Sequence, residues 1–207
     1  MESASESNGS RGIQHILQSP TVIFSLVLVA VYIIIGAIVG NFFEPIQLQN
    51  VVVDLLVQSD APTPIFPWTV LTAIFLHANI LHIASNVFFL LFFGFILEEQ
   101  VSKSRWVMTF FITGLVGSLG VVGSDVLGYF LTGAPNSSVP AYAVGASGAI
   151  YGIMGTAVGL KVVLLLIFLL GLNVLAGGGG PAHLAGLVAG LVLRRYWSLG
   201  GGSFRGI

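Results

Sequence analysis

The stretch Gly145-Ala146-Ser147-Gly148-Ala149-Ile150-Tyr151-Gly152 places one hydroxyl between glycines at the start of an apolar segment. A second apolar segment opens with Pro181-Ala182-His183, so that 36 residues separate the histidine from the serine. A serine and a histidine at the starts of two hydrophobic helices are parts from which a nucleophile and its general base can be built. The rest of the chain decides whether they can meet, and in what surroundings.

The composition is that of a protein with several membrane spans. Of the 207 residues, 56% are hydrophobic and only 7% are charged, whereas a soluble domain has about 25% charged residues. The net charge of −1 argues against a nucleic-acid partner. The chain has no cysteine, which excludes disulfides and thiolate metal sites. We therefore expect the lipid bilayer to surround most of the chain.

Six apolar segments predict an all-α membrane protein with six spanning helices, since about 20 residues cross the hydrocarbon of a bilayer. The expected spans are Thr21–Gly40, Ile80–Leu97, Trp106–Gly123, Ala146–Leu160, Val162–Ala176 and Ala182–Leu193.

The segments around these spans are more polar. A polar tail (1–20) precedes the membrane domain (21–197), and a short tail (198–207) follows it. Residues 41–76 are expected to form an outer interfacial loop, with Phe66 and Trp68 among the lipid headgroups. We expect polar turns at Asp125–Val144 and Gly177–Gly180.

The basic residues predict the orientation of the bundle, because cytoplasmic loops carry an excess of Lys and Arg. Six spans with both termini in the cytoplasm put all seven basic residues on the cytoplasmic side: Arg11, Lys103, Arg105, Lys161, Arg194, Arg195 and Arg205. The second, fourth and sixth spans then begin at the outer surface. His82, Ser147 and His183 are therefore expected at one depth, just below that surface.

Ser147 and His183 are the candidate nucleophile and base, although each has a plainer interpretation. A serine in a membrane helix is more often bonded to its own backbone or packed against a neighbour. A histidine at the start of a span is costly and usually functional, but at the interface it can simply be solvated.

Small residues favour the functional interpretation. A base must lie within about 3 Å of its nucleophile, and glycine stripes let membrane helices approach closely. Gly148 on one segment and Gly186 and Gly190 on the other supply such stripes, and Gly145 frees the backbone before the serine. Tyr151, one turn after Ser147, is expected to stack on the imidazole of His183.

His82 and Asn86 are spaced i, i+4 and so share one face of the second span. Two side-chain donors at the depth of the serine suit an oxyanion hole, completed by the backbone N–H of Ser147. Hydrogen bonding between helices is the alternative. His77 lies five residues before His82, which predicts a different face and a role in loop packing. A zinc site is the chemical rival, but the sequence lacks H-E-x-x-H, and we expect no metal.

Together these residues resemble the rhomboid family of intramembrane serine proteases. The matching positions are His82-x-x-x-Asn86, Gly94-x-x-x-Glu98, Gly145-x-Ser147-Gly148, Tyr151 and His183-x-x-Gly186-x-x-x-Gly190. The resemblance implies a Ser147–His183 dyad without an acidic third member, an oxyanion hole from His82, Asn86 and the Ser147 amide, and no cofactor. It also implies transmembrane protein substrates cut near their outer ends, by an integral multi-pass protein of a prokaryotic plasma membrane.

Two features differ from the family's pattern. Trp68 is followed by Thr69 rather than by arginine, and the interval from Ser147 to His183 is short for two helices and a turn. Each of those helices has about fifteen residues, or some 22 Å. A catalytically inactive rhomboid-like protein that binds transmembrane helices is therefore the main alternative. A small transporter or channel would need polar residues through the midplane, whereas those of this chain gather near one surface.

Overall fold

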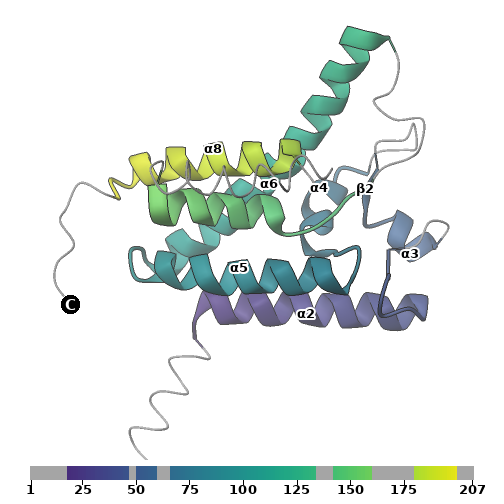
Figure 1. The fold of residues 1–207 in the computed structure, drawn as a ribbon, viewed down its shortest axis with the longest axis horizontal. Coiled ribbons are helices and arrows are strands. Elements are labelled where there is room, and N and C mark those ends of the chain that lie inside the picture. The colour runs from purple at the N-terminus through teal and green to yellow at the C-terminus, as the bar shows by residue number, and fades with distance from the viewer. Residues whose placement is uncertain (1–17, 47–49, 60–65, 134–141, 160–179, 200–207) are drawn as a thin grey trace, which may run out of the picture.

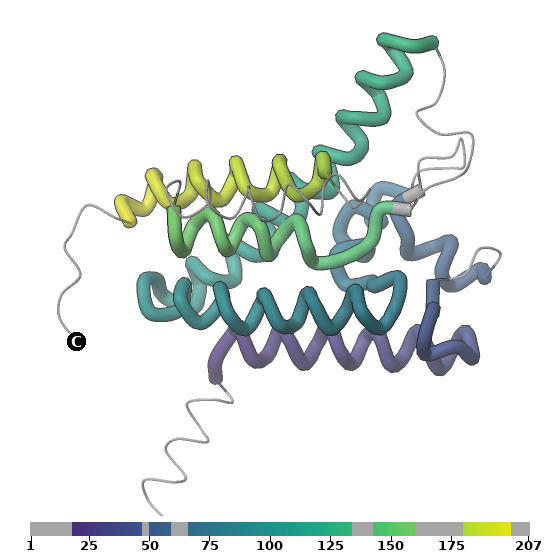
Figure 2. The backbone as a smooth tube through the Cα atoms, in the orientation of Figure 1, coloured from purple at the N-terminus to yellow at the C-terminus, as the bar shows by residue number. Residues whose placement is uncertain are grey.

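The computed structural model describes residues 18–46, 50–59, 66–133, 142–159 and 180–199. Long helices lying side by side make up most of this part of the chain (Figures 1 and 2). They are α2 (Pro20–Val39), α5 (Ile80–Glu98), α6 (Lys103–Thr132), α8 (Gly180–Tyr196) and a helical segment at 147–159. The expected helical class is confirmed.

Local signals explain where α2 begins and ends. The Ser19 side chain accepts a hydrogen bond from the Val22 N–H at the start of the helix, as N-cap residues do. The helix stops at Gly40, whose φ of 75° is the left-handed conformation that glycine adopts readily. The first expected span is thus confirmed to within one residue at each end.

The α5 helix likewise begins at a side-chain cap, because Asn79 accepts a hydrogen bond from the His82 N–H. Its start places His82 in the first turn, and its end at Glu98 agrees with the predicted second span.

The α6 helix is longer than the sequence predicts. It begins after the N-cap Ser102 and runs for 30 residues to Thr132, so the polar turn expected from Asp125 is wrong over its first eight residues. No proline interrupts this stretch, and the apolar residues that follow Asp125 are compatible with helix. Figure 2 shows the last turns of α6 projecting beyond the rest of the bundle.

Within the described residues, three helices are long and apolar enough to cross a membrane, namely α2, α5 and α6. The expected fifth span, Val162–Ala176, and the Lys161 turn lie outside the described residues, as do 1–17, 134–141, 177–179 and 200–207. Gly180, expected to belong to the four-glycine turn, is already part of α8. The six-span count and the location of the termini stay predictions.

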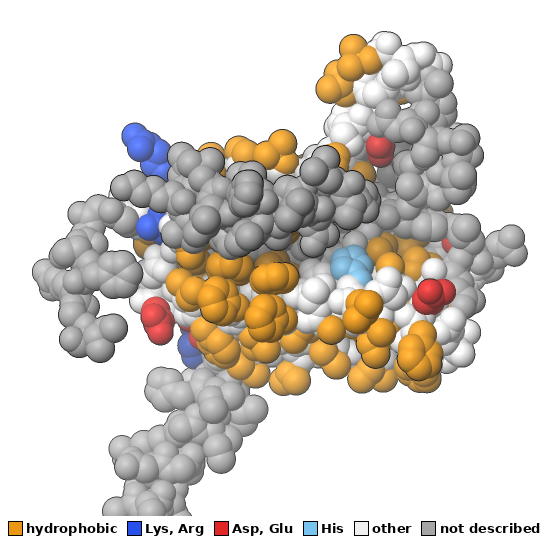
Figure 3. Space-filling view, in the orientation of Figure 1, with side chains coloured by type: hydrophobic (Ala, Val, Ile, Leu, Met, Phe, Trp, Pro, Cys, Tyr) orange, Lys and Arg blue, Asp and Glu red, His pale blue; other side chains and the backbone are white. Residues whose placement is uncertain are grey.

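Charge separates the two ends of the bundle. The described basic residues lie at the start of α6 (Lys103 and Arg105) and the end of α8 (Arg194 and Arg195). Figure 3 shows Lys and Arg at one end only of the visible face, with apolar side chains along the flank. The α5 helix, segment 147–159 and α8 all begin at the opposite end (Figure 1). We call these the inner end and the outer end.

Short elements cross the outer end. They are α3 (Val51–Asp54), β1 (Gln58–Ser59), α4 (Thr69–Thr72), a 3-10 turn (Ala73–Phe75) and β2 (Tyr142–Ala143). The two-residue strands β1 and β2 pair antiparallel, a small addition to the expected all-α fold. They join the outer loop to the chain that leads into Ser147.

Trp68 combines an exposed ring with a bond inside the outer loop. Its indole N–H donates to the Leu55 carbonyl at 2.8 Å, and its ring stacks on Phe66 with centroids 4.5 Å apart. The ring itself is 48% exposed, which leaves an apolar face for the headgroup region.

Candidate active site

Ser147 and His183 meet at the outer end of the bundle. Ser147 is the first helical residue of segment 147–159, and His183 lies in the first turn of α8. The Nε2 atom of His183 is 2.8 Å from the Oγ atom of Ser147, a hydrogen-bond distance. The two helices therefore present a hydroxyl and an imidazole in the relation that proton transfer requires.

Glycine makes this approach possible. A Cβ atom added at Gly186 would collide with the carbonyl of Gly148, and one added at Gly190 would collide with the carbonyl of Gly152. On the other side of the serine helix, a Cβ at Gly117 of α6 would lie 3.1 Å from the Gly148 Cα. Backbones this close leave no room for any side chain at the α8 positions.

The Tyr151 ring lies flat on the His183 ring. Their centroids are 4.2 Å apart and their planes differ by 4°. The Nδ1 atom of His183 is buried and has no hydrogen-bond partner among the described residues. Stacking, rather than an acidic side chain, therefore holds this imidazole in its orientation within the described part of the chain.

His82 faces the glycine that precedes the serine turn. The Ala78 N–H donates to its Nδ1 atom at 3.4 Å, which assigns the ring proton to Nε2. That Nε2 atom would lie 2.7 Å from a Cβ at Gly145, and Gly145 has a φ of 120° that side chains rarely adopt. Both the close imidazole and the positive φ therefore require glycine at position 145. The Nε2–H of His82 points toward the turn that precedes Ser147.

Asn86 is buried one turn below His82, and its amide donates to the His82 backbone carbonyl at 2.8 Å. Its Oδ1 atom is buried without a hydrogen-bond partner in the described structure. The side-chain amide carries two donor hydrogens, so one remains after the bond to its own helix. His82 and Asn86 lie one turn apart in α5, on the same face, as the sequence predicts.

His77 lies next to His82, and the expectation that their spacing separates them is wrong. The ring centroids are 5.1 Å apart in an edge-to-face arrangement. The reason is that α5 begins only at Ile80, so helical spacing does not apply between the two histidines. His77 also accepts a long hydrogen bond, 3.5 Å, from the Ala146 N–H.

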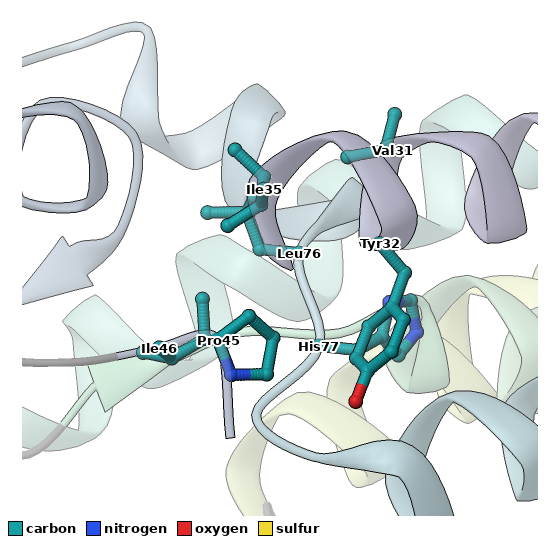
Figure 4. A pocket seen from close by; sticks show the side chains of 7 residues that line it. All are labelled: Val31, Tyr32, Ile35, Pro45, Ile46, Leu76 and His77. Carbon is teal, nitrogen blue, oxygen red and sulfur yellow. The ribbon is translucent and has the colours of Figure 1, made fainter. Parts of the chain in front are cut away.

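The surroundings of His77 keep it neutral. It is 1% exposed and lines a small, mostly apolar pocket with Tyr32, Ile35 and Leu76 (Figure 4). Burial, together with the neighbouring His82, lowers the pKa of His77 to about 3. A neutral imidazole in the outer loop therefore supports the turn before Ser147.

Two polar contacts that hold the serine helix were not predictable from the sequence. Thr113 of α6 donates to the Ala149 carbonyl at 3.2 Å, and Thr156 donates to the Gly190 carbonyl of α8 at 2.9 Å. Threonine is common in membrane helices, so only the facing glycine stripes could have pointed to these partners. In the described part of the chain, no three His, Cys, Asp or Glu side chains are grouped to hold a metal ion.

Comparison with known proteins finds similarity over part of these helices. Residues 66–161 match the Rhomboid domain, which includes α5, α6 and the serine helix. This part of the chain is a rhomboid domain. It is 32% identical over 90 residues to Rhomboid-like protease 3 of Toxoplasma gondii, covering 42% of this chain and 32% of that protein. It is also 32% identical over 143 residues to the mitochondrial RHOMBOID-like protein 6 of Arabidopsis thaliana, covering 61% of this chain and 42% of that protein.

A third relative, the chloroplastic Rhomboid-like protein 11 of Arabidopsis thaliana, is 34% identical over 90 residues, or 44% of this chain and 28% of that protein. The chain thus spans less than half the length of these curated relatives. A rhomboid domain together with α2, α5 and α6 makes this an integral membrane protein.

Proposed function

We propose that this rhomboid chain is an intramembrane serine endopeptidase that hydrolyses peptide bonds in or near the transmembrane segments of other proteins. The observation that carries the proposal is the distance of 2.8 Å between Nε2 of His183 and Oγ of Ser147. A serine that served only packing would need no imidazole at hydrogen-bond distance and no glycine-lined approach between the helices.

In the proposed reaction, Ser147 Oγ attacks the carbonyl carbon of the scissile bond while His183 Nε2 takes the hydroxyl proton. The tetrahedral intermediate collapses, the C–N bond breaks, and His183 returns the proton to the leaving amine. Water then attacks the acyl-enzyme, again with His183 as the base, and releases the carboxylic acid and Ser147. A dyad can act without an aspartate when packing fixes the imidazole, and the stacked Tyr151 supplies that packing.

The negative oxygen of the intermediate would be bound by the backbone N–H of Ser147, the Nε2–H of His82 and the free amide hydrogen of Asn86. Two observations support these roles. Segment 147–159 begins at Ser147, so the first N–H groups of that helix have no partner within it. The bond from Ala78 to His82 Nδ1 leaves the donor on Nε2, toward Gly145.

The proposed topology is six spans with both termini on the cytoplasmic side. It is supported by the basic residues at the inner end of the described bundle, which lies opposite Ser147 and His183. Substrates would then be membrane proteins cut near their outer ends, without a cofactor. The prokaryotic plasma membrane stays a prediction, since relatives with mitochondrial and chloroplastic names match as well.

Labelling by a fluorophosphonate tests the proposal. The purified protein, in detergent and in liposomes, is incubated with the probe beside Ser147→Ala and His183→Ala. The matched control is Ser85→Ala, an exposed serine of α5 whose hydroxyl donates to the His82 backbone. We expect covalent labelling of the wild type and of the control, and none of the other two variants.

The contrary result is equally clear. Folded wild-type protein that is not labelled in either environment would overturn the protease assignment. The remaining candidate would be an inactive rhomboid-like protein that binds transmembrane helices.

A further inference from the structure

The serine helix and α8 run side by side in the same direction. The offset in sequence is 36 residues between Ser147 and His183, 34 between Thr156 and Gly190, and 38 between Thr156 and Arg194. An offset that stays between 34 and 38 from the outer to the inner end describes two parallel helices packed against each other. Axial sliding of one helix along the other would change every one of these contacts together.

At the inner end, Arg194 of α8 binds the last carbonyls of the serine helix. Its Nη1 atom donates to the carbonyls of Thr156 at 2.7 Å and Ala157 at 2.9 Å. Carbonyls in the last turn of a helix carry the negative end of the helix dipole, so a guanidinium is well suited to bind them. The bond also crosses from the helix that carries the base to the helix that carries the nucleophile.

Gln100 and Gly159 lie against the guanidinium of Arg194. Gln100, just after α5, donates to the same Ala157 carbonyl at 3.0 Å, and its Oε1 atom accepts from Arg194 at 3.5 Å. Gly159 has a φ of 70°, and a Cβ there would lie 2.7 Å from the Arg194 Nε atom. A left-handed glycine ends the described helix where the arginine side chain passes.

We propose that Arg194, braced by Gln100, is a positioning residue that sets the axial register of α8 on the serine helix and thereby the Ser147–His183 distance. This inference rests on the proposed function of that pair. The glycine contacts along the seam fix how closely the helices approach, but smooth backbone surfaces resist sliding weakly. Directional hydrogen bonds supply the missing constraint, from Thr156 to α8 within the seam and from Arg194 to the serine helix at the inner end.

The two helices are short and stiff enough for a shift at Arg194 to reach the Ser147–His183 pair. From Ala157 to Ser147 the helix is about 15 Å long, and from Arg194 to His183 about 16 Å. Stiff helices of that length transmit an axial shift with little loss. A slip of one residue is about 1.5 Å, enough to remove a hydrogen bond of 2.8 Å between Ser147 and His183.

Arg194→Ala is the test, and Arg195→Ala is its matched control. Arg195 is the next residue of α8, carries the same charge at the same end, and is exposed. Gln100→Leu removes only the brace, and Arg194→Lys keeps a donor without the planar fork. These two milder variants keep the test available if Arg194→Ala does not fold.

Two kinetic constants of fluorophosphonate labelling are measured, the rate at saturating probe and the concentration for half saturation. We expect Arg194→Ala to lower the saturating rate about tenfold to a hundredfold, the usual effect of displacing a catalytic group by an ångström. Gln100→Leu and Arg194→Lys should lie between Arg194→Ala and the wild type. The half-saturating concentration should not change, because the probe site itself is intact.

A second readout does not require activity. The chain has four histidines, so the imidazole nitrogen resonances of protein labelled with 15N-histidine can be assigned with His183→Ala. The spectrum of Ser147→Ala defines the His183 Nε2 resonance without its hydrogen bond. We expect Arg194→Ala to move that resonance toward the Ser147→Ala value, and Arg195→Ala to leave it in place.

The outcomes separate the two proposals. If the wild type is not labelled, the protease assignment fails, and the His183 resonance still decides the role of Arg194. If Arg194→Ala is labelled at the wild-type saturating rate with an unmoved His183 resonance, the positioning role is wrong. The same conclusion follows if Arg195→Ala has equal effects, since charge at the inner end would then explain them.

Discussion

The histidine rings of the outer loop and the charged side chains of the inner end differ in the lengths of their hydrogen bonds. At the outer end, the bonds that the rings of His77 and His82 accept are long, 3.5 and 3.4 Å. At the inner end, Glu98 accepts two bonds of 2.7 Å from Ser19 Oγ and the Thr21 N–H, and Arg194 donates one of 2.7 Å. Charge-assisted bonds are short and strong in this way.

Buried side-chain atoms without a hydrogen-bond partner are also distributed unevenly between the two ends of the described bundle. Five buried side-chain atoms have no hydrogen-bond partner in the described structure, and four of them lie at the outer end, on Gln58, His77, Asn86 and His183. An unmade bond on a buried group is costly. The outer end thus gives up stability to keep donors and acceptors available, whereas the inner end holds the helices. Substitutions at the two ends should therefore separate rate from stability.

The largest effect is expected at His82. His82→Ala removes a proposed oxyanion donor, and the loss of one such donor costs about 100-fold to 1,000-fold in rate. The hydrogen bond that the ring accepts from the Ala78 N–H is long, 3.4 Å, so the free energy of unfolding should change little. The measurements are the saturating labelling rate and the thermal midpoint of the same preparations.

If His82→Ala lowered the thermal midpoint as strongly as the labelling rate, the proposed difference between the two ends would be wrong. That result would show that the outer end is held by its polar groups after all. Ser85→Ala, on the exposed side of the same turn, controls for disturbance of α5.

A smaller effect of the opposite kind is expected at Glu98. Glu98→Gln keeps the shape but removes the charge from the two bonds to the start of α2. Hydrogen bonds to charged groups contribute about 1.5–3 kcal/mol, against about 1 kcal/mol for neutral ones. We expect the free energy of unfolding to fall by about 1–3 kcal/mol, with an unchanged labelling rate per folded molecule.

Glu99→Gln is the matched control, because Glu99 is adjacent and exposed. The absence of a rate effect at Glu98 would also sharpen the role of Arg194. Both residues are charged and lie at the inner end, but only Arg194 contacts the helix that carries Ser147. A fall in labelling rate with Glu98→Gln would mean that any loosening of the inner end disturbs the outer one.

Much of this arrangement could be predicted from the sequence because it depends on local patterns. Apolar length predicts α2 and α5, and glycine spacing predicts that α8 lies against the serine helix. The contact between Gly186 and the Gly148 carbonyl is the outcome. The roles given to Ser147 and His183 stay proposals, but their juxtaposition was predictable from two helix starts at one depth.

The misses depend on tertiary contacts. From the sequence, Arg194 indicates only the orientation of the bundle, since a charge count cannot show which carbonyls a guanidinium reaches. Helical spacing predicts that His77 and His82 lie on different faces of one helix. The prediction is wrong because α5 begins only at Ile80, after the Asn79 cap, so His77 is not part of that helix. The sequence predicts a turn from Asp125, but α6 continues to Thr132, because the apolar residues after Asp125 are compatible with helix.

The smallest predicted effect is the pH dependence that His77 gives to stability. Burial lowers its pKa in the folded protein to about 3, while an unfolded histidine has a pKa of about 6.5. As the pH falls below about 6.5, the unfolded state binds a proton that the folded state does not. Each pH unit between those two values should therefore lower the free energy of unfolding by up to about 1.4 kcal/mol.

Unfolding titrations of the wild type and of His77→Gln, at pH 7, 6 and 5, test this dependence. Only the difference between the two slopes belongs to His77, because other groups titrate in both proteins. We expect the wild type to lose more stability than His77→Gln as the pH falls. Parallel slopes would mean that His77 accepts a proton in the folded protein at little cost, and that the outer end is wetter than its 1% exposure implies. The outer end would then be open to water even at the residue that supports the turn before Ser147.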